Sequence, residues 1–180
     1  MGYTLIIGQA VIDYDQDEGT AQVDAEEVRL EHAPAFGEPT DNTNERWPSY
    51  SSWADSMRAL GLVDVMFNKR NGGRGIFESE GKPYLPLMQS HPGETAICKA
   101  HVDYVRSAIE KYKAAHSTHR AEYPPPKPGA VPRWGTSGIY LEEDYDESPE
   151  YDSALCRGEW LLFWLEWAIE NCSMPVFVNR

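Results

Sequence analysis

The sequence has few cysteines and no long hydrophobic run, and each shortage excludes a class of protein. The three cysteines, Cys98, Cys156 and Cys172, are odd in number and widely spaced, which argues against a disulfide framework and favours a reducing compartment. The longest apolar run, Trp160 to Ile169, contains Glu166 and falls far short of the roughly 20 residues that span a bilayer. The N-terminus lacks the basic region and the cleavage site of a signal peptide. We therefore expect a cytoplasmic protein without a membrane segment.

Basic residues are also scarce. The chain has 16 Lys and Arg against 29 Asp and Glu, a net charge of −13. Such a charge repels phosphates, so non-specific binding to nucleic acid is not expected. Residues 13–31 and 142–152 each carry a net charge of −7, whereas 99–133 carries +4. The simplest interpretation of the two acidic runs is solvated surface; the alternative is mimicry of nucleic acid, which would block a DNA-binding host protein.

The distribution of apolar residues predicts a small, mostly antiparallel sheet. Apolar residues make up 41% of the 180 residues, enough for the core of one domain. Tyr3 to Leu30 is typical of an antiparallel hairpin, in which Gly8 indicates a bulge. Leu62 to Phe67 alternates like a strand, and Ile76 to Glu80 is a candidate returning strand. Pro175 to Asn179 ends the chain as a short strand.

Three segments have helical spacing. Ser49 begins a short helix that Gly61 ends, Glu94 to Ala115 is amphipathic, and Ser153 to Cys172 is apolar around most of its circumference, as expected of a buried helix. In the loop before the first helix, Phe36 and Trp47 are expected to pack on the core. Five prolines make residues 122–138 an extended strap between the two long helices. The predicted fold is therefore a single α+β domain, with a sheet packed by two long helices and one short helix.

The loop "NKRNGGRG", Asn68 to Gly75, is the strongest candidate for ligand binding. It matches neither of the two glycine-rich phosphate-binding motifs, G-x-x-x-x-G-K-[ST] and G-x-G-x-x-G. Its glycines nevertheless expose backbone N–H groups, and Lys69, Arg70 and Arg74 could hold a phosphate between them. Trp134 is a candidate aromatic partner for such a ligand. The alternative interpretation is the charged tip of a hairpin that joins Leu62–Phe67 to Ile76–Glu80.

The second acidic run alternates acids with tyrosines, a pattern that suits a protein interface. The alternative is a flexible connector. The candidate partner-binding residues are Glu142, Glu143, Asp144, Tyr145, Asp146 and Tyr151.

The evidence for catalysis or a metal is weaker. Cys98 and His101 lie on one helical face, where a core role is the simpler interpretation. His116 and His119 lack the spacing of a zinc motif, and no metal or cofactor is predicted. An enzyme whose site is assembled from His91, His101 or the acidic residues is the alternative function.

The run "NERWPSYSSWADSMRALGL", with "MGYTLIIGQA" before it and a Trp-rich helix ending "NCSMPVFVN" after it, resembles a loose group of small uncharacterised tailed-bacteriophage proteins. The likeness covers the two ends of the chain better than Asn68 to Gly138. It implies a phage origin, the cytoplasm of the infected host and an accessory role during infection, and it carries over no site residues.

The hypothesis that follows is a non-catalytic binding protein that acts on a host factor. It would antagonise host defence either by sequestering a phosphorylated, nucleotide-like ligand or by acidic mimicry of nucleic acid, so its partner is a small anion or a host protein. A structural or assembly protein of the virion is a further alternative. Whether the chain forms a homo-oligomer stays open.

Overall fold

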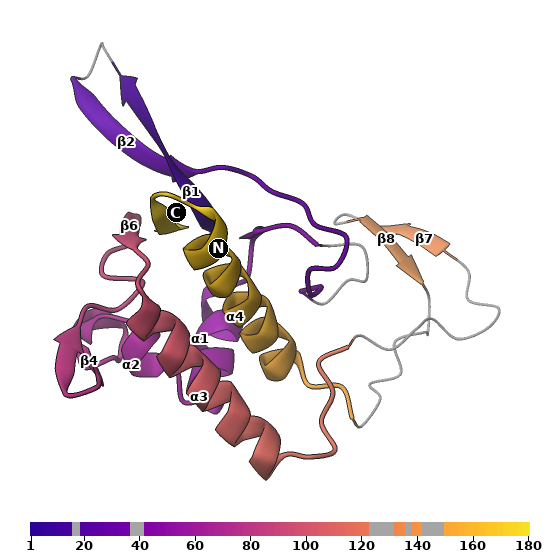
Figure 1. The fold of residues 1–180 in the computed structure, drawn as a ribbon. Coiled ribbons are helices and arrows are strands. Elements are labelled where there is room, and N and C mark those ends of the chain that lie inside the picture. The colour runs from indigo at the N-terminus through magenta and orange to yellow at the C-terminus, as the bar shows by residue number, and fades with distance from the viewer. Residues whose placement is uncertain (16–18, 37–41, 123–131, 136–137, 142–149) are drawn as a thin grey trace.

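The sheet is built on β1 (Leu5–Asp15), and its paired strands are antiparallel. The computed structural model describes residues 1–15, 19–36, 42–122, 132–135, 138–141 and 150–180. The first half of β1 pairs with β9 (Pro175–Asn179), and the second half pairs with β2 (Thr20–Ala25). β6 (Gly93–Ala96) lies beyond β9, and β3 (Glu45–Arg46) pairs beside the start of β1. The sheet therefore joins both ends of the chain to its middle (Figure 1).

The predicted N-terminal hairpin is confirmed, but its register contains no bulge at Gly8. Residue partners run without a break from Leu5↔Asn179 to Gln9↔Pro175 and on from Ala10↔Ala25 to Asp15↔Thr20. A Cβ on Gly8 would lie 3.0 Å from Asn44 Nδ2. That amide donates to the carbonyls of Ile7 (2.8 Å) and Glu26 (2.7 Å). Glycine at position 8 thus leaves room for the buried Asn44, which ties β1 to the following loop.

Three helices cover one face of the sheet. α1 (Tyr50–Ala59) and α3 (Lys99–Ala115) both pack against α4 (Ser153–Asn171), which also contacts β1. In Figure 1 the three helices lie together below the sheet. Their apolar side chains form one core with alternate residues of β1 and β9, including Trp53, Trp160, Trp164, Leu5, Ile7 and Phe177. The fold is α+β, as the sequence predicts, and α4 is its central helix.

The helix boundaries differ slightly from those predicted. Ser49 caps α1 by accepting a hydrogen bond from the Ser52 N–H, and Gly61 (φ +71°) follows its end, both as expected. α3 begins at Lys99, because Gly93–Ala96 forms β6 instead. α4 is capped by Asp152 and not by Ser153: its carboxylate accepts from the N–H groups of Ala154 (2.9 Å) and Leu155 (3.0 Å).

The middle hairpin lies further along the chain than the sequence predicts. The segment predicted as a strand, Leu62–Phe67, contains a four-residue helix, α2 (Val63–Met66), and Leu62, Val65, Met66 and Phe67 are all buried. An apolar run that is buried on several sides has no single polar face, so the alternation of apolar residues in it did not indicate a strand. The hairpin is formed by β4 (Phe77–Ser79) and β5 (Lys82–Tyr84) around a turn at Glu80 and Gly81.

The proline-rich segment ends in a second small hairpin. Pro132–Gly135 forms β7, which pairs with β8 (Gly138–Leu141) in a separate two-stranded sheet. The rest of the predicted strap, 123–131, lies outside the described residues. Within the part of the chain that the structure describes, no helix combines the length and apolar character needed to cross a bilayer.

Candidate functional site

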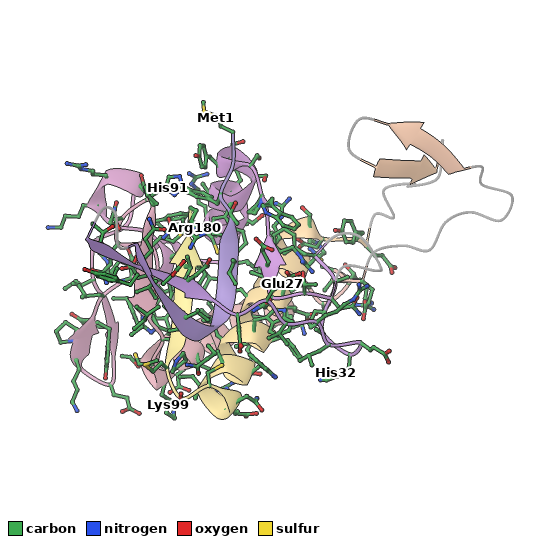
Figure 2. The ribbon with its side chains drawn as sticks, turned by 90° about the horizontal axis from the view of Figure 1, so that it is seen from above. Met1, Glu27, His32, His91, Lys99 and Arg180 are labelled. Atoms are coloured by element: carbon green, nitrogen blue, oxygen red, sulfur yellow. The ribbon has the colours of Figure 1, made fainter. Side chains whose placement is uncertain are left out.

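A groove on the side of the fold near the C-terminus brings together residues from four separate segments. Its volume is about 850 Å³, within the usual range for small-molecule sites. Figure 2 places His91, one of its residues, near the end of the chain at Arg180. We call it the His91 groove; it is lined by Tyr3, Tyr50, Asn68, Lys69, Arg70, Asn71, Gly75, Gln89, Ser90 and His91.

One wall is the first part of the "NKRNGGRG" loop, which is not the tip of a hairpin. Lys69–Asn71 forms a short 3₁₀ turn, η1, between α2 and β4. The Asn68 side chain caps it: Oδ1 accepts from the Asn71 N–H (3.1 Å) while Nδ2 donates to the Gln89 carbonyl (2.5 Å). Gly72 then reverses the chain with φ +93°. The loop is therefore fixed to the segment before His91. That segment, residues 89–91, lines the groove as well.

Gly73 is the position where this loop tolerates no side chain. An added Cβ would lie 1.9 Å from the Phe67 carbonyl oxygen and 3.1 Å from that of Val63. Both are backbone atoms, so they cannot rotate away. Gly72 has nothing within 4 Å of the same position.

We predict that Gly73→Ala lowers the free energy of unfolding by at least about 2 kcal/mol, in the range of other overpacking substitutions. Gly72→Ala is the matched control, since it meets the strain of a left-handed backbone but no steric clash. Urea unfolding of both variants measures the difference. Equal losses of unfolding free energy in the two variants would contradict the close approach of Gly73 to the Phe67 carbonyl.

Lys69 and Arg70 are the cations of the groove. Both are exposed, and no carboxylate among the described residues lies within ion-pair distance of either. None of the described residues that line the groove is acidic. In a chain of net charge −13, this is a local concentration of positive charge that faces an open groove.

Arg74, predicted to bind with them, is engaged elsewhere. Its backbone N–H donates to Asp64 Oδ1 (3.0 Å) and its Nε to Asp64 Oδ2 (2.7 Å). The hydrogen bond to Asp64, followed by the charge of that carboxylate, raises the pKa of Arg74. Arg74 does not line the groove; its contacts fix the loop to α2.

The other predicted site residues that the structure describes, Trp134 and Tyr151, are not among the lining residues of this groove. Trp134 lies on β7, opposite Ile139 of β8, and that hairpin is on the other side of the fold from β4 (Figure 1). Of the predicted partner-binding run, Glu142 to Asp146 lie outside the described residues, whereas Tyr151 is half-buried and bridges to Arg120 just before α4. The interface hypothesis for this run stays a prediction.

Aromatic rings form the floor of the groove. The Tyr3 ring is 4.5 Å from the Tyr50 ring and 4.9 Å from the His91 ring, both edge-on. Tyr3 is buried, and burial, with a smaller contribution from Tyr50, raises its pKa. The Tyr50 ring and the His91 ring are exposed, so both can contact a ligand.

His91 is held by hydrogen bonds at both ring nitrogens. Nδ1 lies 3.0 Å from Oδ1 of the fully buried Asn179, and Nε2 lies 3.0 Å from the Tyr50 hydroxyl. Asn179 in turn donates from Nδ2 to the Gly93 carbonyl at 3.0 Å. The last residues of β9 thus orient a histidine whose other nitrogen faces α1. His91 is a candidate from the sequence alone, whereas Tyr3, Tyr50 and Asn179 are not, because no spacing in the sequence links four segments this far apart.

The Cys98–His101 pair has the structural role expected of it. His101 is buried, accepts at Nδ1 from the Cys98 N–H (3.1 Å) and donates from Nε2 to the Leu85 carbonyl (2.9 Å). Burial lowers the pKa of His101 despite two backbone hydrogen bonds that act to raise it. Its Nδ1, which accepts from the Cys98 N–H, caps the start of α3. No three His, Cys, Asp or Glu side chains in the described ranges are grouped so as to hold a metal ion.

A second polar cluster joins the end of α3 to the start of α4. Asp152 Oδ2 accepts from the Tyr112 hydroxyl and lies close to His119 Nδ1, both at 2.6 Å, while the His116 ring stacks on Tyr112. Burial acts to raise the pKa of Asp152, but the hydrogen bonds from Tyr112, Leu155, His119 and Ala154 outweigh it and lower that pKa. Because Oδ1 of Asp152 also caps α4, this cluster is a helix-joining contact.

Tyr112 is expected to titrate late. Burial, followed by the hydrogen bond to Asp152, raises the pKa of its hydroxyl from 10.0 to about 12. A raised pKa in the folded state stabilises the fold below about pH 10, and this contribution is lost as the pH rises towards about 12. Spectrophotometric titration should show a tyrosinate step near pH 12 that is absent in Tyr112→Phe and present in Tyr14→Phe, which removes an exposed ring. A late step that survives in Tyr112→Phe would contradict the contact.

The comparisons with known proteins identify no relative. No protein-family model matches the chain, and neither a curated protein nor a solved structure is significantly similar to it.

Proposed function

We propose that the His91 groove binds a small phosphorylated ligand of the nucleotide class. The observation that carries this proposal is the presence of Lys69 and Arg70, with no carboxylate partner among the described residues, in a groove without acidic lining. Arginine and lysine are the usual partners of phosphate oxygens. Because the rest of the protein is acidic, an anion attracted to this surface would be directed to these two side chains.

The other lining residues favour a ligand with both a flat and a polar part. Tyr50 and His91 offer exposed rings, and the side chains of Asn71 and Ser90 offer hydrogen-bonding groups. A volume of about 850 Å³ is enough for a ligand the size of a nucleotide. Inorganic phosphate alone would leave most of the groove empty.

In the biological role that we propose, the protein removes such a ligand from the cytoplasm of a host cell. The resemblance to bacteriophage proteins supports this setting, since a phosphorylated nucleotide signal is one means by which a cell could report infection. Acidic mimicry is a separate hypothesis that depends on Glu142 to Asp146. It would be tested by pull-down from lysate with and without neutralisation of those residues.

The experiment is isothermal titration calorimetry against a panel of probes: inorganic phosphate, adenosine, AMP, ATP and a 3′,5′-linked cyclic dinucleotide. We expect binding of at least one phosphorylated nucleotide, weaker binding of phosphate and none of adenosine. Affinity should fall with added salt, because the two cations are exposed. Equal binding of adenosine and AMP, or no binding of any phosphorylated probe, would overturn the proposal.

A further inference from the structure

The hydrogen bonds around His91 fix where its protons lie. Asn179 donates from its amide nitrogen to the Gly93 carbonyl, so its oxygen is the atom that faces His91 Nδ1. An amide oxygen is an acceptor, and Nδ1 must therefore carry the hydrogen. In the neutral ring Nε2 is then unprotonated, and it must accept from the Tyr50 hydroxyl 3.0 Å away. Tyr50 therefore donates a hydrogen bond to His91, and His91 donates one to Asn179.

This arrangement suits a nucleophile better than a simple anion-binding group. A hydroxyl that donates its hydrogen to His91 presents lone pairs to any ligand in the groove. A site that served only to hold an anion would direct the hydroxyl hydrogen towards the ligand. Lone pairs repel phosphate oxygens but can attack phosphorus, and a hydroxyl next to a base that a third group orients is the general pattern of an activated nucleophile.

The geometry points to a phosphodiesterase or phosphodiester-transfer activity in which Tyr50 is the nucleophile, His91 the general base and Asn179 a positioning residue. This inference rests on the proposed function, because it takes the phosphorylated ligand of the His91 groove to be the substrate. It goes beyond that function in naming a reaction.

The step is balanced as follows. The Oη–H bond of Tyr50 breaks and its proton moves to His91 Nε2, while Oη forms a bond to phosphorus. The bond from phosphorus to the leaving oxygen breaks, and the leaving alkoxide takes a proton from water. His91 loses its extra proton to the solvent. A phosphodiester of Tyr50 remains. Water then attacks phosphorus, His91 takes a proton from that water, and the Oη–phosphorus bond breaks. His91 returns the proton to Oη of Tyr50, and a phosphate monoester is released.

The charge of the groove suits a phosphodiester substrate. A diester carries one negative charge, and loss of the tyrosine proton adds a second to the transition state. Lys69 and Arg70 supply two positive charges in the same groove, where they would stabilise both. The absence of an acid from the lining means that nothing there repels the developing charge.

The experiment uses bis(4-nitrophenyl) phosphate with the full chain. Wild type is expected to release 4-nitrophenolate and, after rapid quenching, to carry one 4-nitrophenyl phosphoryl group on Tyr50 in a peptide mass map. Tyr50→Phe, which keeps the ring, should lose release by at least about 100-fold and lose the adduct. His91→Ala should fall by about 100-fold or more, as general bases usually contribute, and regain part of the rate with added imidazole. Asn179→Leu, which removes the acceptor oxygen that faces Nδ1, should lower kcat without raising KM.

The outcomes separate the two proposals. Calorimetric binding of a cyclic dinucleotide by wild type without release or adduct would overturn the activity and leave the proposed function standing. Equal release by wild type and Tyr50→Phe, or imidazole without effect on His91→Ala, would overturn the assigned roles. Absence of both binding and release would overturn the proposed function as well.

Discussion

Replacing Lys69 and Arg70 together with alanine is expected to weaken binding of a phosphorylated ligand by about 100-fold. In the proposed complex each would contribute a charge-assisted hydrogen bond to phosphate, and the loss of two such bonds corresponds to a change of about this size. Neither side chain forms an ion pair with a described residue or contributes to the core, so the double variant should unfold at the wild-type temperature. Calorimetry at low and at physiological salt measures the loss, and most of the salt dependence should disappear with the two cations.

Two controls remove positive charge outside the groove: the first removes two charges, as the double variant does, and the second removes one. Lys111→Ala with Arg58→Ala removes one lysine and one arginine from exposed helical positions. Arg74→Ala removes the third cation of the same loop, whose guanidinium is bonded to Asp64. We expect the first control to bind within about twofold of wild type. If it weakens binding as much as Lys69→Ala with Arg70→Ala, the effect is one of overall charge and the groove has no special role.

Trp160→Ala is expected to lower the free energy of unfolding by about 3–5 kcal/mol, the usual loss for a large aromatic in a core. Trp160 is fully buried in α4 and donates from Nε1 to the Thr43 carbonyl at 2.9 Å. Its ring lies 5.1 Å from that of Phe36, and the buried Arg46 guanidinium lies 5.7 Å over it. The substitution therefore leaves a cavity and a Thr43 carbonyl without its indole donor, and it removes one of the two rings beneath the Arg46 guanidinium.

Thermal and urea unfolding measure this loss. In a chain of 180 residues the melting temperature should fall by about 10 °C, since about 1 kcal/mol corresponds to 2–4 °C at this size. The control is Trp47→Ala, because Trp47 is 64% exposed, and we expect it to change stability by no more than about 0.5 kcal/mol. Similar losses in the two variants would show that α4 is not the centre of the core.

The exposure of Trp47 differs from the prediction made from the sequence. Phe36 and Trp47 were both expected to pack on the core, and Phe36 does, against Trp53 and Trp160. Trp47 does not. Composition alone does not say which of two aromatic residues in an irregular loop faces inward, because a loop has no fixed periodicity.

Local signals predicted the elements that are long and have clear ends. Ser49 and Gly61 bound α1, and the apolar circumference of Ser153 to Cys172 predicted the central helix. Leu62–Phe67 was predicted wrongly, since its short apolar run is compatible with a strand or a helix and tertiary packing decided between them. The placement of β9 between β1 and β6 depends on contacts between the two ends of the chain, which periodicity does not report.

The candidate site was predicted in part. The cations and glycines of Asn68 to Gly75 are visible in the sequence, and two of the three cations do line a groove. The bond from Arg74 to Asp64 was not foreseen, because ten residues separate them across α2. Nor was the meeting of Tyr50, His91 and Asn179, whose positions are set by the start of a helix, a loop and the last strand. Such a site is visible only once the sheet has joined the two ends of the chain.

The most direct test of the central claim is native mass spectrometry of the protein purified from expressing cells, alongside Lys69→Ala with Arg70→Ala. We predict that wild type retains a small phosphorus-containing molecule, or takes one up from an added nucleotide mixture, and that the double variant does not. A ligand free of phosphorus, or equal retention of the same phosphorylated molecule by both proteins, would contradict the account.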